Sequence, residues 1–342
     1  MREGYSLFEK ISLLYEILKS PILFYDKIRM LKDIRKYMRM LVIEALEPAL
    51  SRMPIGKEIP IEKLMKVEGY VDGELLLELL RFVEEEGVIR VKQGKIVLLR
   101  EAPERPFSNM LEKMHPKLLE AFGTFGEPTV KVIRARLSGD VDEVGSAELR
   151  VYWSIALGGE FYRIQRDKAI RFSRVKEEAG KRAGTFRLLD YGCGSGEGTV
   201  QLFNHLSEVK DELEIDGCDV SEELLRMARE DTGLGLPIHF FSLKEERPAE
   251  GRYDAIFISH VLHWLEDPVR VVGELKSYLK PDGFIFGVES TISDRLYPVD
   301  LFIRLYGAKG FPTFEELQRW FGENNMKLNY DPVWFSFKAT QV

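Results

Sequence analysis

The clearest chemical signal is a glycine-rich stretch, RLLDYGCGSGEGT, at residues 187–199. An acid, Asp190, stands two residues before the first of three glycines, Gly192, Gly194 and Gly196. Glycines so placed let a backbone turn tightly and approach a ligand that any Cβ would push away. NAD sites use Gly-x-Gly-x-x-Gly because a helix end must receive a pyrophosphate, which Asp190 would repel. The carboxylate could instead lie beside the cationic amino group of an amino-acid-like ligand.

Further polar residues follow at the ends of later apolar runs. Asp219 ends the run over 213–219, where a carboxylate can accept hydrogen bonds from both hydroxyls of a ribose. His260 and His263 follow the run that starts at Tyr253. A general base placed there would face a ligand bound at the carboxyl edge of a parallel sheet.

The elements that must hold these residues alternate between strand and helix. Leu188 and Leu189 mark a buried strand, and Ser221 can cap the helix after the second strand. We therefore predict an α/β fold: a doubly wound, mostly parallel, seven-stranded Rossmann-like sheet over residues 185–342.

The first half of the chain predicts helices and one hairpin. Residues 5–50 indicate a helical region broken near Pro21, and residues 26–46 form a basic amphipathic helix. Such a helix could lie on a membrane surface, but burial in a dimer or domain interface is favoured. Helices and a hairpin over 55–100 suggest a winged helix.

The second helix of this region argues against DNA binding. It runs over residues 74–86 and carries five acids against one Arg, so its field would repel phosphates. We expect a structural or dimerising role. The expected domains are residues 1–107, a helical connector over 108–184 that contributes to the substrate pocket, and residues 185–342.

Composition narrows the class of protein. The chain has 342 residues and a net charge of −7, which disfavours nucleic acid as a partner. Its two cysteines, Cys193 and Cys218, lie in strand motifs, and no signal peptide is visible, so we expect a cytoplasmic protein. Many charged residues with few amides hint at a thermophilic source.

Four segments together resemble class I S-adenosylmethionine-dependent methyltransferases. They are LDYGCGSG, GCDVSEELL, YDAIFISHVLHW and LKPDGFIFGVE, in the family's order, and the resemblance runs from about residue 185 to the C-terminus. With the region before it, the chain resembles small-molecule O-methyltransferases whose N-terminal winged-helix domain dimerises. Residues 313–321 predict a helix, and residues 327–330 and 333–340 predict a closing hairpin, as the resemblance implies.

The same resemblance implies the site. S-adenosyl-L-methionine is the implied cofactor, and no metal is expected. His263 matches the family's base and Glu289 the acid that orients it, although the Asp that follows the family's His is absent here. A structural or substrate-lining role for His263 stays open. The implied cofactor residues, which include the backbone of Cys193 and the end of the third strand, are Asp190, Gly192, Cys193, Gly194, Gly196, Asp219, Val220, Ser242, Leu243, Ser259 and His260.

The function expected from the sequence is methyl transfer to a small molecule, most often a hydroxyl oxygen in this family, by a homodimer. The alternatives are a methyltransferase for a membrane-associated lipid or quinone, an NAD-dependent oxidoreductase, and a winged-helix regulator with a degenerate sheet.

Overall fold

The computed structural model describes residues 21–103, 106–107, 110, 126–140, 158–233, 235–294 and 296–342. Contacts divide these residues into two units. The described residues of the sheet unit are 21–25, 158–233, 235–294, 296–297 and 308–342, and those of the helical unit are 26–103, 106–107, 110, 126–140 and 298–307. This division differs from the expected segments, because residues 158–184 group with the sheet and residues 298–307 with the N-terminal half.

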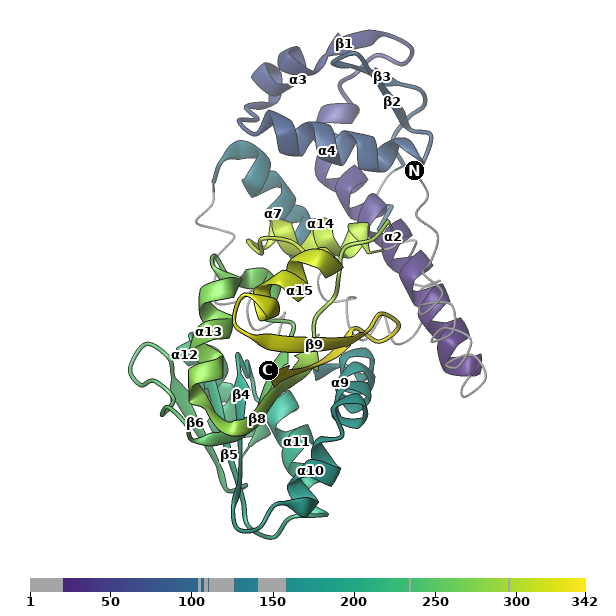
Figure 1. Cartoon of the computed structure of the whole chain (residues 1–342). Coiled ribbons are helices and arrows are strands. Elements are labelled where there is room, and N and C mark those ends of the chain that lie inside the picture. Colours follow the sequence, from purple (N-terminus) through teal and green to yellow (C-terminus); the bar gives the residue numbers. More distant parts are fainter. Residues whose placement is uncertain are drawn as a thin grey trace. The chain divides into compact units, whose positions relative to one another are not determined.

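The sheet unit contains the seven-stranded sheet that the sequence predicts (Figure 1). Five strands are parallel, and β10 pairs antiparallel with β8 on one side and with β9, the edge strand, on the other. In order across the sheet the strands are β6 (Ile238–Ser242), β5 (Leu213–Asp219), β4 (Phe186–Tyr191), β7 (Tyr253–Ser259), β8 (Leu279–Val288), β10 (Ser336–Gln341) and β9 (Met326–Asp331). The predicted fold class is confirmed.

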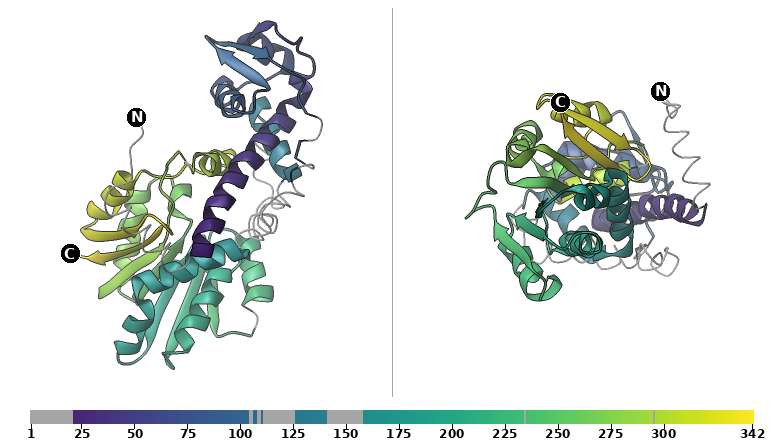
Figure 2. Two further views of the ribbon diagram at one scale, coloured as in Figure 1. Left: turned by 90° about the vertical axis from the view of Figure 1, so that its right-hand side faces the viewer. Right: turned by 60° about the horizontal axis from the view of Figure 1, so that its bottom comes forward.

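Helices cover both faces of this sheet, as Figures 1 and 2 show. One face packs against α9, α10 and α11, and the other against α13 and α15. Their bounds, with α12, are α9 (Glu160–Ser173), α10 (Val175–Lys181), α11 (Glu197–Ser207), α12 (Glu222–Met227), α13 (Pro268–Tyr278) and α15 (Phe314–Gly322). Because both faces are covered, the central strand β7 is buried over all but its last residue.

Local sequence signals explain where these helices begin. Ser221 caps α12 and Asp267 caps α13, each by accepting a backbone N–H with its side chain. Thr313 opens α15 with a capping box. The predicted helix near 313–321 is therefore confirmed, and so is the closing hairpin.

One strand boundary differs from the expected one. The second strand of the hairpin was expected from Val333 but begins at Ser336. Asp331 Oδ1 accepts a hydrogen bond from the Val333 N–H at 2.9 Å, and Phe335 has a φ of 59°. This side-chain-to-backbone bond stabilises a turn over residues that are apolar enough to look like strand.

The helical unit contains a small antiparallel sheet and four described helices. The sheet has the order β1 (Glu58–Pro60), β3 (Lys95–Leu98), β2 (Ile89–Lys92). Its hairpin turns at Gln93 and Gly94, with φ of 49° and 73°, as predicted. The helices are α2 (Pro21–Leu50), α3 (Ile61–Glu68), α4 (Gly73–Glu84) and α7 (Gly126–Ser138), and α14 (Tyr297–Leu305) lies almost wholly in this unit.

Two details of the helical unit bear on the sequence predictions. Pro48 lies inside α2 and does not end it. Arg39, one of the basic residues of the predicted amphipathic helix, is buried and forms ion pairs with Glu85 and Glu86. Arg35 also lies 4.0 Å from Glu85. The basic charges of α2 therefore neutralise part of the acidic end of α4.

These contacts leave two predictions open. Winged-helix dimerisation and binding to a membrane surface stay predictions. Among the helices that the model describes, none is both long and apolar enough to span a bilayer.

Candidate functional site

The glycine-rich turn has the backbone that its sequence predicts. Gly192, Gly194 and Gly196 follow β4 with φ of 75°, 55° and 88°, in the left-handed region that favours glycine. A Cβ at Gly192 would lie 2.5 Å from Val261, whereas a Cβ at Gly194 would meet nothing within 4 Å. The turn is thus packed at its start and open at its middle, where a ligand can approach the backbone.

Asp190 lies buried beneath this turn at the end of β4. Thr199 of α11 donates a hydrogen bond to its Oδ2 at 2.6 Å. Burial raises the pKa of Asp190 to about 7, against the opposing effects of the Thr199 hydrogen bond and the Arg166 charge. Because the carboxylate has little solvent to stabilise it, a cationic group in the turn would favour its ionised form.

Asp219, at the end of β5, connects the two strand ends. Its Oδ2 accepts the Gly194 N–H at 3.0 Å, and its Oδ1 accepts the Ser221 N–H at 2.9 Å. Asp219 therefore presents a carboxylate, a group that accepts hydrogen bonds from hydroxyls, at this edge of the sheet. Next to it, Val220 is 57% exposed, so it offers apolar surface beside the carboxylate.

The end of β6, the third strand along the chain, is hydrogen-bonded to the end of β5. The Leu243 N–H donates to the Asp219 carbonyl at 3.0 Å, and the buried Ser242 hydroxyl accepts from the Lys244 N–H at 3.4 Å. These two predicted residues therefore lie at the same sheet edge as Asp219. Burial raises the pKa of Cys193 and of Cys218, which keeps both thiols neutral packing groups.

His263 and Glu289 form a buried pair. Their side chains are 2% and 0% exposed, and Nδ1 of His263 lies 2.6 Å from Oε1 of Glu289. The Leu262 N–H donates to the other oxygen, Oε2, at 2.9 Å. With an ionised Glu289 accepting, Nδ1 must donate, so Nε2 is the nitrogen with the free lone pair. The predicted contact between these two residues is confirmed, while their catalytic roles stay predictions.

Ser259 and His260 leave β7 at the same edge. His260 has a φ of 59°, unusual for a residue with a side chain, and such strain concentrates at functional sites. Its N–H donates to the Val288 carbonyl at 2.9 Å, which ties the loop to β8. The edge therefore joins Asp190, Asp219, His260 and the pair at His263.

Two side chains of α9, those of Gln165 and Arg166, lie beside His260 or the glycine turn, and the sequence did not predict either of them. His260 Nε2 lies 3.2 Å from Oε1 of Gln165, and its ring meets Tyr162 edge-to-face at 5.1 Å. The side chain of Arg166 lies above Gly198 beside Asp190. Tyr162, Gln165 and Arg166 are spaced by three and four residues, so their shared helix face was the available signal.

The same neighbours perturb His260. Burial lowers its pKa to about 3, and the charges of His263 and Arg166 act in the same direction. The imidazole of His260 is therefore neutral at physiological pH. Tyr162 is itself buried, and its ring packs directly on His260.

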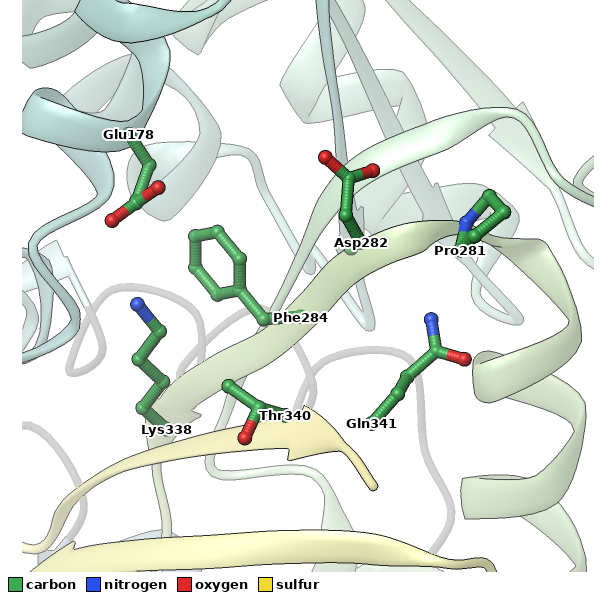
Figure 3. A pocket seen from close by; sticks show the side chains of 8 residues that line it. Glu178, Pro281, Asp282, Phe284, Lys338, Thr340 and Gln341 are labelled. Carbon is green, nitrogen blue, oxygen red and sulfur yellow. The ribbon is translucent and has the colours of Figure 1, made fainter.

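A cavity of about 250 Å³ lies away from this edge (Figure 3). Lys338 and Phe284 line it side by side, with Glu178 facing them from α10. Its β8 residues lie near the start of that strand, whereas the site residues follow strand ends. Within the described ranges, no group of three or more acids, histidines or cysteines is arranged to hold a metal ion.

A model of one known protein family matches part of the chain. Residues 189–285 match the family model described as "Methyltransferase domain". This range contains the glycine turn, both aspartates and both histidines of the site, and it ends before Glu289.

Curated relatives match parts of the chain. A malonyl-[acyl-carrier protein] O-methyltransferase of Halalkalibacterium halodurans is 28% identical over 129 residues, 36% of this chain and 46% of the relative. A ubiquinone biosynthesis O-methyltransferase of Proteus mirabilis is 26% identical over 221 residues, 58% of this chain and 85% of the relative. The chain spans half or less of the length of the first curated relatives that it matches.

Solved structures match the fold over nearly the whole chain. The CurJ carbon methyltransferase superposes with a TM-score of 0.69 at 15% identity, covering 97% of both chains. The CMeT domain of the citrinin polyketide synthase gives 0.72 at 15% identity, covering 98% of this chain and 95% of that one. Such identities establish the fold alone, and the methyltransferase match applies to residues 189–285.

Proposed function

We propose that this protein transfers a methyl group from S-adenosylmethionine to a small molecule. One observation carries the proposal: the carboxylates of Asp190 and Asp219 end neighbouring strands on either side of an open glycine backbone at Gly194. An amino acid joined to a ribose needs an acid for its ammonium group and an acid for its hydroxyls. Asp190 and Asp219 supply two such acids along one edge of the sheet.

The residues present fit that cofactor in three respects. Asp190 is a buried acid whose raised pKa favours a cationic neighbour. Asp219 is held at the end of β5 by two backbone hydrogen bonds, and its carboxylate is the kind of acceptor that ribose hydroxyls need. Gly194 leaves space where a side chain would block the cofactor. When bound, the cofactor would supply a methyl group on a good leaving group.

The role of the buried pair is to accept a proton from the acceptor molecule. Nε2 of His263 would take the proton, and the charge that forms on the ring would be stabilised by Glu289 through Nδ1 at 2.6 Å. Glu289 is itself held by the Leu262 N–H. The acceptor that we propose is a hydroxyl oxygen.

A second candidate acceptor is an acidic carbon next to carbonyl groups. It is favoured by the CurJ structure, which is named a carbon methyltransferase and whose match covers 97% of both chains. The same buried histidine would serve either acceptor, because both must lose a proton. Reaction with methyl-labelled cofactor and either a phenol or a 1,3-dicarbonyl compound would separate the two, since carbon NMR distinguishes a methyl on oxygen from one on carbon.

The test of the proposed function is calorimetry with S-adenosylhomocysteine and with NADH. We expect binding of the first and none of the second, and the reverse result would favour the oxidoreductase alternative. The variant His263→Ala should bind S-adenosylhomocysteine normally but lose roughly 10²–10⁴-fold in turnover. A loss below tenfold would remove His263 from the role of base.

A further inference from the structure

Three glycines surround one aromatic ring beneath the candidate cofactor site. The ring belongs to Phe240 of β6, which is 7% exposed. A Cβ added at Gly196 would lie 3.2 Å from the ring, one at Gly217 would lie 2.7 Å away, and one at Gly233 would lie 2.6 Å away. These glycines come from the glycine turn, the middle of β5 and the chain after α12, so the ring rests on bare backbone of three segments.

The segments around the ring also carry the cofactor residues. Gly196 ends the glycine turn, and Cys193 of that turn packs in the same cluster as Phe240. Gly217 lies two residues before Asp219 on β5. The Phe240 ring therefore lies between two segments. One is the turn that is expected to hold the amino-acid end of the ligand, and the other is the strand that is expected to hold its ribose.

The third segment is built around the ring as well. After α12 the chain forms a π-helical turn over Ala228–Thr232, which is closed by a hydrogen bond from the Gly233 N–H to the Ala228 carbonyl at 2.8 Å. Arg229 donates to the Phe240 carbonyl at 3.2 Å. Wide turns of this kind are uncommon and recur at functional sites.

We propose that Phe240 is a positioning residue that sets the spacing between the glycine turn and Asp219, and that Gly217 is a glycine because the ring fills its side-chain space. The proposal rests on the proposed function, since it assigns the ring a role in cofactor affinity. It predicts that the size of residue 217 and the size of residue 240 are coupled.

Gly217 is the cleanest of the three glycines to test. Gly196 has a φ of 88°, so any substitution there strains the backbone, and a Cβ at Gly233 would also strike the Ala228 carbonyl at 2.8 Å. At Gly217 the obstructing atoms all belong to side chains, namely those of Phe240 and Cys193. A collision with the ring can therefore be relieved by shortening residue 240.

The experiment is a double-mutant cycle with S-adenosylhomocysteine as the ligand, measured by calorimetry. Overpacking at Gly217→Ala should weaken binding by about tenfold or more. Phe240→Leu alone should also weaken it, because the ring no longer spaces the segments. The double variant Gly217→Ala/Phe240→Leu should bind more tightly than Gly217→Ala alone.

A matched control separates positioning from general loss of stability. Phe321→Leu shortens a fully buried ring of α15 in the core on the other side of the sheet, so it should lower the melting temperature without changing affinity. With an acceptor in hand, Phe240→Leu should raise the KM for S-adenosylmethionine and change kcat by less than about threefold.

Two failures are distinguishable. If the wild type binds S-adenosylhomocysteine and the double variant binds no better than Gly217→Ala, the positioning role of Phe240 is wrong and the proposed function stands. If the wild type itself does not bind, the proposed function fails and the positioning role falls with it. Equal affinity losses in Phe240→Leu and Phe321→Leu would also overturn the positioning role.

Discussion

If Asp190 binds the ammonium group of the ligand as proposed, we expect ligand binding to depend on pH in a direction that follows from the burial of Asp190. Its carboxyl is 2% exposed, and burial raises its pKa to about 7. A shift of about 3 units from the ordinary value corresponds to about 4 kcal/mol between the two protonation states. A ligand ammonium group that binds the carboxylate can recover part of this free energy, so binding should drive a proton off Asp190.

The magnitude follows from the pKa. At pH 6 about nine tenths of the Asp190 carboxyls carry a proton, and at pH 8 about one tenth do. If the ligand binds only the ionised form, its apparent affinity should rise about thirtyfold between pH 5.5 and pH 8. Folding stability has the opposite trend: the folded state holds more protons than the unfolded state between about pH 4 and 7, so stability falls across that window and then levels.

The assay is calorimetry of S-adenosylhomocysteine binding in buffers with different heats of ionisation. We expect release of about 0.9 proton at pH 6 and about 0.1 at pH 8. Thr199→Val removes the 2.6 Å hydrogen bond that lowers the pKa of Asp190, so its midpoint should move to higher pH. Asp190→Asn should abolish the release at pH 6. Release that persists unchanged in Asp190→Asn would refute the assignment.

Three further predictions follow from single contacts. Glu289→Gln should lower kcat by roughly 10²–10⁴-fold and leave S-adenosylhomocysteine affinity unchanged, because it removes the negative charge that would stabilise protonated His263. A loss under tenfold in steady-state assays would contradict this. Asp219→Ala should weaken binding by about 1–3 kcal/mol in calorimetry, because it leaves ribose hydroxyls without acceptors, and an unchanged Kd would show that the ribose lies elsewhere. Asp72→Ala should lower the free energy of unfolding by about 1 kcal/mol in urea titration, because Asp72 Oδ1 accepts the Leu75 N–H at 2.9 Å; equal stability would mean that solvent replaces the cap.

The sequence predicts those parts of the site that short local patterns specify. A strand followed by glycines and a capped helix specifies its own backbone, which is why Asp190 and Asp219 could be placed at strand ends before the structure. The parallel order of strands then brings those ends to one edge. The pairing of His263 with Glu289 came from family resemblance, because 26 residues separate them.

The contributions of α9 could not be read in the same way. Gln165 and Arg166 are polar residues on a helix, and such residues most often face solvent. Their burial results from packing of α9 on the sheet, a contact between segments far apart in the sequence. Arg39 in the helical unit has the same explanation, because its partners Glu85 and Glu86, just after α4, lie 46 and 47 residues away.

The two histidines of the site differ in their hydrogen-bond partners, and this difference divides their possible roles. His263 faces the carboxylate of Glu289, which stabilises a positive charge on the ring. His260 faces the neutral amide of Gln165, and its pKa is lowered to about 3 by burial and by nearby positive charge. Their ring centroids lie 6.3 Å apart, so a proton on one ring opposes a proton on the other. Acid–base sites often place two titratable groups in environments that push their pKa values apart, so that the two groups take different roles. If His263 takes a proton as the proposed base, the carboxylate of Glu289 would stabilise the charge on its ring, while His260 remains neutral.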